Sequence, residues 1–307
     1  MKKLPIAVAV AAAMSAGAAS AYTMGTFDHG LLVPQVFHNG AGDTTAVGLI
    51  THGCDFSAYP DGKTGLVYWT FFDENSTHIT DGAVPMTNND VYSFVWANES
   101  GLGLEGMQGY LVFFVDTDAN GTIDAADGEC LAGEAFHVVA ADADVAYKAV
   151  WPIDALLDTA GAGIPDPTTM NAASITTLSA GAPVGDTITM RYSIANGDTT
   201  SIAVWSADDI SGVYTVNMFD DEENRKSVNF ALPNAEQNSI DPSTIVGRPA
   251  DYVNGFIEWV TPDPATLPAD PPGSRDNGAD GNGVVSYSVI RSVAFSARQT
   301  VVNPHHP

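Results

Sequence analysis

The sequence predicts an all-β protein, built as an antiparallel β-sandwich or jelly-roll-like fold with little helix. Short segments rich in β-branched and aromatic residues recur along the chain, and clusters of Gly, Pro, Asn and Asp separate them. Stretches with the periodicity of an amphipathic helix are scarce. Strands of this kind pack one face and leave the other polar, and 307 residues suffice for one large sandwich or two smaller ones.

The expected strands follow from composition. Each is rich in Val, Ile, Thr, Tyr, Phe or Trp, the residues that fit a pleated surface. They occupy residues 66–72, 91–96, 110–115, 136–140, 213–219, 227–232, 253–260 and 284–297. One short helix is expected at residues 153–158, directly after Trp151 and Pro152.

Two hairpins are expected in the second half of the chain. In residues 187–194, Ile188, Met190 and Tyr192 alternate with polar residues, and residues 201–205 return after an Asn-Gly turn. The acidic run at residues 220–224 is typical of the solvated tip of a second hairpin.

The N-terminus has the pattern of an export signal. Lys2 and Lys3 precede a short, Ala-rich apolar run that ends in an A-x-A cleavage site at Ala21. A single membrane-spanning helix is the alternative, but the run is short for that purpose. We therefore expect residues 1–21 to be a signal peptide and the mature protein to be secreted, either periplasmic or extracellular.

The rest of the chain divides by composition. We expect an N-terminal β domain at residues 22–158, a linker rich in Ala, Gly, Ser, Thr and Pro at 159–185, and a C-terminal β region at 186–307. The C-terminal region includes a Pro- and Gly-rich loop at residues 261–283, which the sequence predicts to be long and exposed.

The chain is strongly acidic, with 37 acidic and 11 basic residues and a formal net charge of −26. Cleavage after Ala21 would remove Lys2 and Lys3 and take this charge to −28, from 37 acidic and 9 basic residues. Anionic phosphate backbones and lipid surfaces would be repelled by such a protein. We therefore expect neither nucleic acid binding nor direct membrane insertion.

Residues 116–127 place oxygen donors at every position that a twelve-residue calcium loop requires. Such a loop surrounds the cation with oxygens from positions 1, 3, 5, 7, 9 and 12, the seventh through its backbone carbonyl. The residues at these positions are Asp116, Asp118, Asn120, Thr122, Asp124 and Asp127. Gly121 stands where the backbone turns sharply, and Ile123 supplies an apolar anchor. The sequence therefore predicts a Ca²⁺ site, with an ordinary surface turn as the alternative.

These twelve residues resemble the calcium loops of the EF-hand superfamily. Asp127 at the last position is similar to the dockerin type, whereas calmodulin has Glu there. The flanks depart from the helix–loop–helix pattern, because residues 110–115 are typical of a buried strand and Gly128 interrupts any exit helix. We therefore expect a structural site at the end of a strand rather than a calcium sensor.

Cys54 and Cys130 are the two cysteines of the chain. A disulfide can persist in an exported protein. This one would close a loop of about 77 residues and stabilise the fold by roughly 4 kcal/mol in the chain-entropy model. Because Cys130 lies three residues after Asp127, the bridge would fix the exit of the calcium loop. Two buried free thiols are the alternative.

The sequence offers little evidence of a catalytic site. The seven histidines lack zinc-site spacing, and no G-x-S-x-G nucleophile motif is present. Two acids keep open a polysaccharide-active enzyme with paired carboxylates: Glu258, which lies between aromatic residues, and Asp73, which follows a strand. An outward-facing strand position is the ordinary interpretation of such acids.

The expected function is therefore non-catalytic. We expect an exported, calcium-stabilised β-sandwich that acts by binding or assembly at the cell exterior or in the periplasm, with a glycan, a surface protein or another copy of itself as partner. The alternatives are the polysaccharide-active enzyme and a subunit of a surface filament or surface layer.

Overall fold

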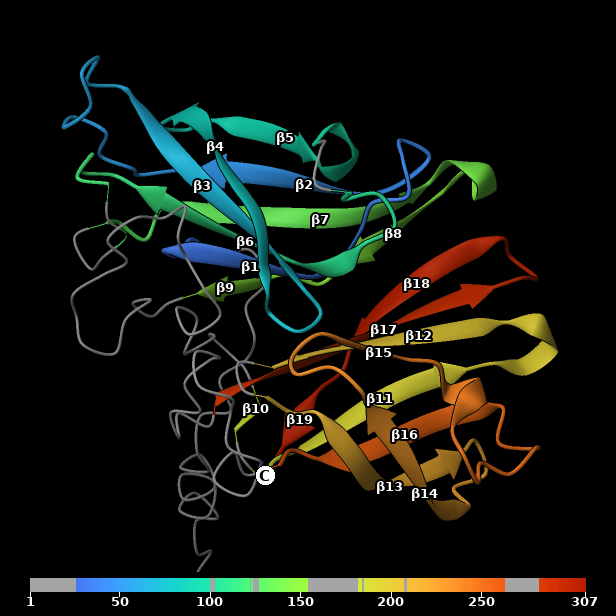
Figure 1. Ribbon diagram of the computed structural model, residues 1–307. Helices are drawn as coiled ribbons and strands as arrows, with labels where there is room; N and C mark the ends of the chain where they lie inside the picture. Colours follow the sequence, from blue (N-terminus) through green and yellow to red (C-terminus); the bar gives the residue numbers. More distant parts are fainter. Residues whose placement is uncertain are drawn as a thin grey trace, which may run out of the picture.

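Antiparallel sheets make up most of the described chain, and the predicted all-β class is confirmed (Figure 1). The computed structural model describes residues 26–99, 103–121, 123, 127–153, 182–183, 185–206, 209–262 and 282–307. The expected signal peptide and most of the expected linker and Pro- and Gly-rich loop lie outside these ranges. In the described part, helical structure is limited to short 3-10 turns at Trp96–Asn98, Ala140–Asp142, Ala195–Gly197 and Pro242–Thr244.

The N-terminal half forms two sheets. The N-terminal outer sheet, in the order β5-β2-β7-β8, contains β5 (Val91–Val95), β2 (Asp43–Thr51), β7 (Leu131–Val139) and β8 (Asp144–Lys148). The N-terminal inner sheet, in the order β4-β3-β6-β1-β9, contains β4 (His78–Thr87), β3 (Thr64–Asp73), β6 (Gln108–Asp116), β1 (Gly30–Phe37) and β9 (Trp151–Ile153).

The C-terminal half forms two further sheets. The C-terminal inner sheet, in the order β10-β17-β12-β15 with β18 beside β17, contains β10 (Ala182–Pro183), β17 (Asn282–Ser292), β12 (Thr199–Ser206), β15 (Asn238–Ile240) and β18 (Ala297–Val302). The C-terminal outer sheet, in the order β14-β13-β16-β11-β19, contains β14 (Arg225–Leu232), β13 (Gly212–Asp220), β16 (Asn254–Val260), β11 (Thr187–Ser193) and β19 (His305–His306).

The four sheets stack as four layers with three cores between them (Figure 1). The first core fills the N-terminal sandwich, and the third fills the C-terminal sandwich. The middle core joins the two inner sheets, where Leu32 and Tyr110 meet Trp205 and Tyr287. The N-terminal inner sheet is therefore covered on both faces. This explains why β6 is a continuous apolar run rather than an alternating one.

Polar contacts reinforce the middle core. The backbone N–H of Gln35, at a β-bulge in β1, donates to Gln237 Oε1 at 2.9 Å. The Tyr110 hydroxyl donates to Glu236 Oε2 at 2.9 Å. Arg298 of β18 adds ion pairs to Asp142 at 2.6 Å and to Asp144 at 2.9 Å. The two sandwiches therefore share an interface that is both apolar and hydrogen-bonded.

One predicted hairpin is wrong. Residues 187–194 and 201–205 form strands β11 and β12, and the turn lies at Asn196-Gly197, but the strands belong to different sheets. Strand β11 pairs with β16 and β19, whereas β12 pairs with β15 and β17. Strand β11 buries Ile188, Met190 and Tyr192 in the third core, and β12 buries Ile202 and Val204 there from the facing sheet, so the turn connects two layers. The hairpin tip at residues 220–224 is confirmed, since β13 pairs with β14.

Two other expectations need correction. The single strand expected at residues 284–297 is interrupted, because β17 ends at Ser292 and a turn with Ser296 at φ 48° leads into β18. Ile153, where a helix was expected to begin, is the last described residue of β9, and residues 154–158 lie outside the described ranges. Among the described residues, none belongs to a helix with the length and apolar character needed to cross a bilayer.

Candidate metal centre

The strand β6 positions the first residue of the predicted calcium loop. It lies between β3 and β1 in the N-terminal inner sheet, and its last residue, Asp116, pairs with Leu66 of β3. Asp116 is only 1% exposed although it is a carboxylate. A buried carboxylate needs hydrogen bonds or a cation to offset its desolvation.

Three of the predicted ligands come together at this strand end. Asp116, Asp118 and Asp127 each place one carboxylate oxygen so that the three atoms lie within 4.8 Å of one another. Asp127 is also buried, at 2% exposed, and Asp118 is partly buried. This is the one group of three or more His, Cys, Asp or Glu side chains in the described ranges that could hold a metal ion.

Backbone amides of the loop orient two of the carboxylates. Asp116 accepts from the N–H of Ala119 at 2.8 Å and from that of Gly121 at 3.1 Å. Asp127 accepts from the N–H of Thr117 at 2.7 Å. Ala119 at φ 60° and Gly121 at φ 77° are left-handed, and this turns the chain back toward Asp116. The loop therefore holds the carboxylates side by side instead of letting them separate.

The electrostatics of the cluster favour a cation. Burial raises the pKa of Asp116, and neighbouring Asp118 raises it further, whereas the amides of Gly121 and Ala119 lower it. The raised pKa means that placing negative charge here is costly in the absence of a positive partner. A divalent cation would remove that cost.

Tyr59 is a structural neighbour of this centre that the sequence did not predict. Its hydroxyl donates to the backbone carbonyl of Asp116 at 3.0 Å and accepts from the N–H of Leu66 at 3.3 Å. Burial, followed by the charge of Asp116, raises the pKa of Tyr59. The phenol therefore stays protonated and fixes the strand end from which the loop begins. No local pattern around residue 59 indicates this contact.

Two anchors hold the loop to the body of the protein. Ile123, the predicted apolar anchor, is 2% exposed and belongs to the middle core. The structure contains the disulfide between Cys54 and Cys130. The backbone carbonyl of Cys130 also accepts from the N–H of His52 at 3.0 Å. The disulfide and the carboxylate cluster thus stabilise neighbouring segments of the chain.

Of the other three predicted ligands, one lies beside the carboxylate cluster and two are outside the described residues. The Asn120 side-chain amide donates to Asp118 Oδ2 at 2.9 Å, so this residue borders the cluster. Thr122 and Asp124 lie outside the described residues. The four described ligand positions are thus close together in space, which is the condition that the twelve-residue pattern demands.

The two acids considered for catalysis do not form a pair. Asp73 caps the turn between β3 and β4, where its carboxylate accepts from the N–H groups of Asn75 and Thr77, both at 2.9 Å. Glu258 is half-buried on β16 in the other sandwich. The C-terminal inner sheet lies between these two layers, so the two carboxylates do not face a common substrate.

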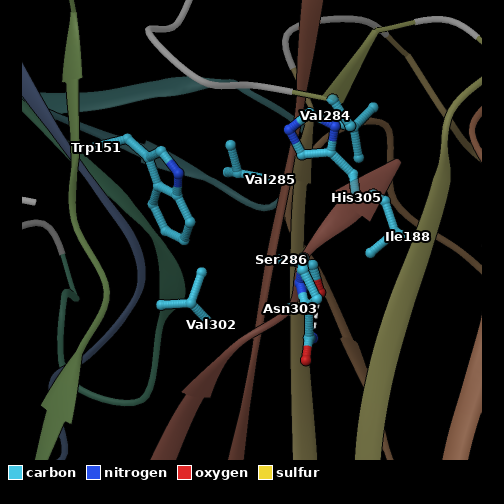
Figure 2. Close-up of a pocket in the computed structure, with 10 residues that line it drawn as sticks. Trp151, Ile188, Val284, Val285, Ser286, Val302, Asn303 and His305 are labelled. Atoms are coloured by element: carbon cyan, nitrogen blue, oxygen red, sulfur yellow. Dashed lines mark hydrogen bonds between the residues drawn. The ribbon is translucent and has the colours of Figure 1, made fainter. Parts of the chain in front are cut away.

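A small cavity of about 150 Å³ lies at the junction of the sandwiches, between Trp151 of β9 and Val285 and Val302 of the C-terminal half (Figure 2). Ser286 and His305 also line it, and His305 Nδ1 lies 2.8 Å from Asp186 Oδ2. The Ser286 hydroxyl donates to the Ala203 carbonyl at 2.8 Å. Its proton therefore points at the backbone rather than at the imidazole, which is not the geometry of an activated nucleophile.

Comparisons of the chain with protein-family models, with curated proteins and with solved structures found no match. The function of the chain is therefore inferred from the chemistry of the site.

Proposed function

We propose that this protein is an exported, calcium-stabilised β-sandwich protein that acts by binding or assembly outside the cytoplasm rather than by catalysis. The observation that carries the proposal is the meeting of Asp116, Asp118 and Asp127 at the end of β6. Export is supported by the leader-like N-terminus and by the disulfide, which persists in oxidising compartments.

Calcium is the cation that best suits the donors. Ca²⁺ takes six to eight oxygen ligands in flexible geometry, whereas Mg²⁺ demands near-ideal octahedral geometry and keeps several waters. The cluster offers carboxylates and loop oxygens but no sulfur or imidazole, which disfavours zinc and copper. In a chain of net charge −26, a bound divalent ion also reduces self-repulsion.

The role of the ion is structural. The loop starts at a strand buried between two cores, is anchored by Ile123 in the middle core, and ends close to the disulfide. No pair of amphipathic helices is present in the described ranges to open on binding, as a sensor would need. Calcium would therefore raise the free energy of unfolding rather than expose a new surface.

Melting curves of the mature protein in calcium and in EDTA test this proposal. Free calcium at 100 times the dissociation constant stabilises the native state by about 2.7 kcal/mol, so Tm should rise by several degrees. Asp118→Asn, at a partly buried ligand position, should abolish most of the shift. Asp61→Asn is the matched control, because Asp61 is an exposed turn acid that accepts from the N–H groups of Lys63 and Thr64.

Titration calorimetry gives the direct reading, with one calcium per chain expected and much weaker binding of magnesium. Identical melting curves with calcium and EDTA, together with no heat of binding, would overturn the structural-metal proposal.

A further inference from the structure

A groove of about 670 Å³ crosses the outward face of the C-terminal outer sheet. At one end lies the β13–β14 hairpin tip with Asp221 and Glu223, and at the other lies Pro304, just before β19. Arg191 of β11 and Phe256 of β16 line it between these ends. Its volume falls within the roughly 300–1,000 Å³ that is usual for small-molecule sites.

The groove lies on the solvent side of the sheet because of strand alternation. In β11 the residues on either side of Arg191, Met190 and Tyr192, are buried in the third core, and in β16 Ile257 next to Phe256 is buried there too. Successive residues point to opposite faces, so Arg191 and Phe256 point outward. The two residues also lie directly opposite each other in the β11–β16 ladder.

An aromatic platform forms one wall of the groove. Phe256 stacks on Phe219 of β13, with ring centroids 4.6 Å apart and planes inclined by 13°. Both side chains are half-buried. Because β16 lies between β13 and β11, the ring face of Phe256 that Phe219 does not cover is turned toward β11 and Arg191. A flat apolar surface is thus presented to the groove.

Charged groups without partners surround this platform. The side chains of Arg191, Asp221 and Glu223 make no hydrogen bond or ion pair with any other residue in the described ranges. The hairpin tip is held in place by Asp220, whose carboxylate accepts from the N–H groups of Glu222 and Asn224 at 3.0 and 2.8 Å. These carboxylate acceptors and guanidinium donors are therefore exposed, and no described residue satisfies them.

We propose that this groove binds an uncharged sugar ring of an extracellular glycan. The C–H groups on one face of a pyranose carry partial positive charge and would pack on the negative face of the Phe256 ring. Its hydroxyls would donate to the carboxylates of Asp221 and Glu223 and accept from Arg191. The proposal names the partner class for the binding role proposed above and does not depend on calcium, because the groove lies in the other sandwich.

The negative charge of the groove and of the whole chain disfavours binding of an acidic glycan. The carboxylates of Asp220, Asp221 and Glu223 outnumber the single guanidinium of Arg191 along the groove, and the chain as a whole carries −26. A polyanion such as polygalacturonate would be repelled by the carboxylates of the groove and by the net negative charge of the chain. An uncharged polyol gains the hydrogen bonds without that cost.

Affinity electrophoresis in native gels tests the proposal, with hydroxyethylcellulose, glucomannan, xyloglucan or laminarin in the gel and polygalacturonate as the charged comparison. We expect at least one neutral polysaccharide to retard the mature protein and polygalacturonate to have no effect. Phe256→Ala and Arg191→Ala should each weaken retardation about tenfold, the loss of roughly one good interaction.

Matched controls separate the groove from the rest of the surface. Phe295→Ala removes an exposed phenylalanine at the β17–β18 turn, 83% exposed, and Lys63→Ala removes an exposed cationic side chain next to β3 in the other sandwich. Both should migrate like the wild type. Should Phe256→Ala fail to fold, Arg191→Ala and Asp221→Asn, at solvent-exposed positions, carry the test.

The groove proposal is overturned if none of the four neutral polysaccharides retards the protein, if the groove variants bind as well as the wild type, or if polygalacturonate binds best. Calcium is assessed separately by melting. Retardation that depends on Phe256 in a protein insensitive to EDTA would uphold the groove and reject the structural metal, and the opposite result would do the reverse.

Discussion

Lys148 is a buried lysine whose desolvation lowers the stability of the folded protein. It ends β8 and is 1% exposed at the junction of the two sandwiches, with its ammonium 4.8 Å from the ring centre of Phe37 and 5.5 Å from that of Tyr287. Burial lowers the pKa of Lys148 to about 7. The aromatic faces attract the cation, but they do not replace its hydration.

The pH dependence follows from that lowered pKa. Below pH 7 the lysine is charged in both the folded and unfolded states, and the full cost of burying the charge is present. Between pH 7 and about 10 the unfolded chain holds the proton and the folded protein does not, so stability rises with pH by ~1.4 kcal/mol per pH unit from this group.

Lys148→Met should therefore stabilise the protein at pH 7, and its advantage over the wild type should shrink by ~2 kcal/mol between pH 7 and pH 9. Denaturant unfolding of both proteins at the two pH values measures this difference. The exposed Lys63→Met is the control and should differ little from the wild type at either pH. An advantage that does not change with pH would show that Lys148 titrates normally.

At the scale of the element, the disulfide links the start of one loop to the end of another. Cys54 and Cys130 are 76 residues apart in sequence, and Cys130 closely follows Asp127. The bridge restricts the unfolded chain and, in the folded state, also limits how far the Asp127 segment can move from Asp116.

The Cys54→Ser/Cys130→Ser double variant should lose roughly 4 kcal/mol of stability and should bind calcium more weakly, because Asp127 must then be ordered at the expense of binding energy. Melting with and without calcium, paired with calorimetric titration, separates the two effects. The wild type in reductant should reproduce the variant. Unchanged calcium affinity in the double variant would mean that the amides of the loop alone order the site.

Elements also show what the sequence can and cannot predict. The strands were predictable because β-branched and aromatic content is local, and the gathering of Asp116, Asp118 and Asp127 followed from the local spacing of a known ligand pattern. That β11 pairs with β16 and β19 rather than with β12 was not predictable, because alternation fixes which face a side chain occupies but not which strand lies beside it.

The tertiary contacts of several residues were also not predictable from the sequence. Tyr59, Lys148 and the Phe219–Phe256 stack acquire their roles from chain segments far away in sequence, and nothing in their own surroundings marks them. The double burial of β6 was visible as a continuous apolar run, yet only the four-layer stack explains it. Local chemistry was thus predictable, and its assembly was not.

At the scale of the whole molecule, the middle core decides whether the two sandwiches behave as one. The N-terminal inner sheet contributes to both the first core and the middle core. The C-terminal sandwich cannot separate without exposing Trp205 and Tyr287, both fully buried. We therefore expect the mature protein to unfold in a single cooperative transition, with equal calorimetric and van't Hoff enthalpies.

Two buried tryptophans provide a matched test of this coupling. Trp205 lies in the middle core, with its ring 5.5 Å from that of Tyr110, whereas Trp259 lies in the third core. Replacement of either by Ala should cost roughly 3–5 kcal/mol. Trp205→Ala should split the calorimetric trace into two transitions because it weakens the junction, and Trp259→Ala should lower Tm while leaving one. Two transitions in the wild type would show that the sandwiches are stable independently and that the middle core contributes little to cooperativity.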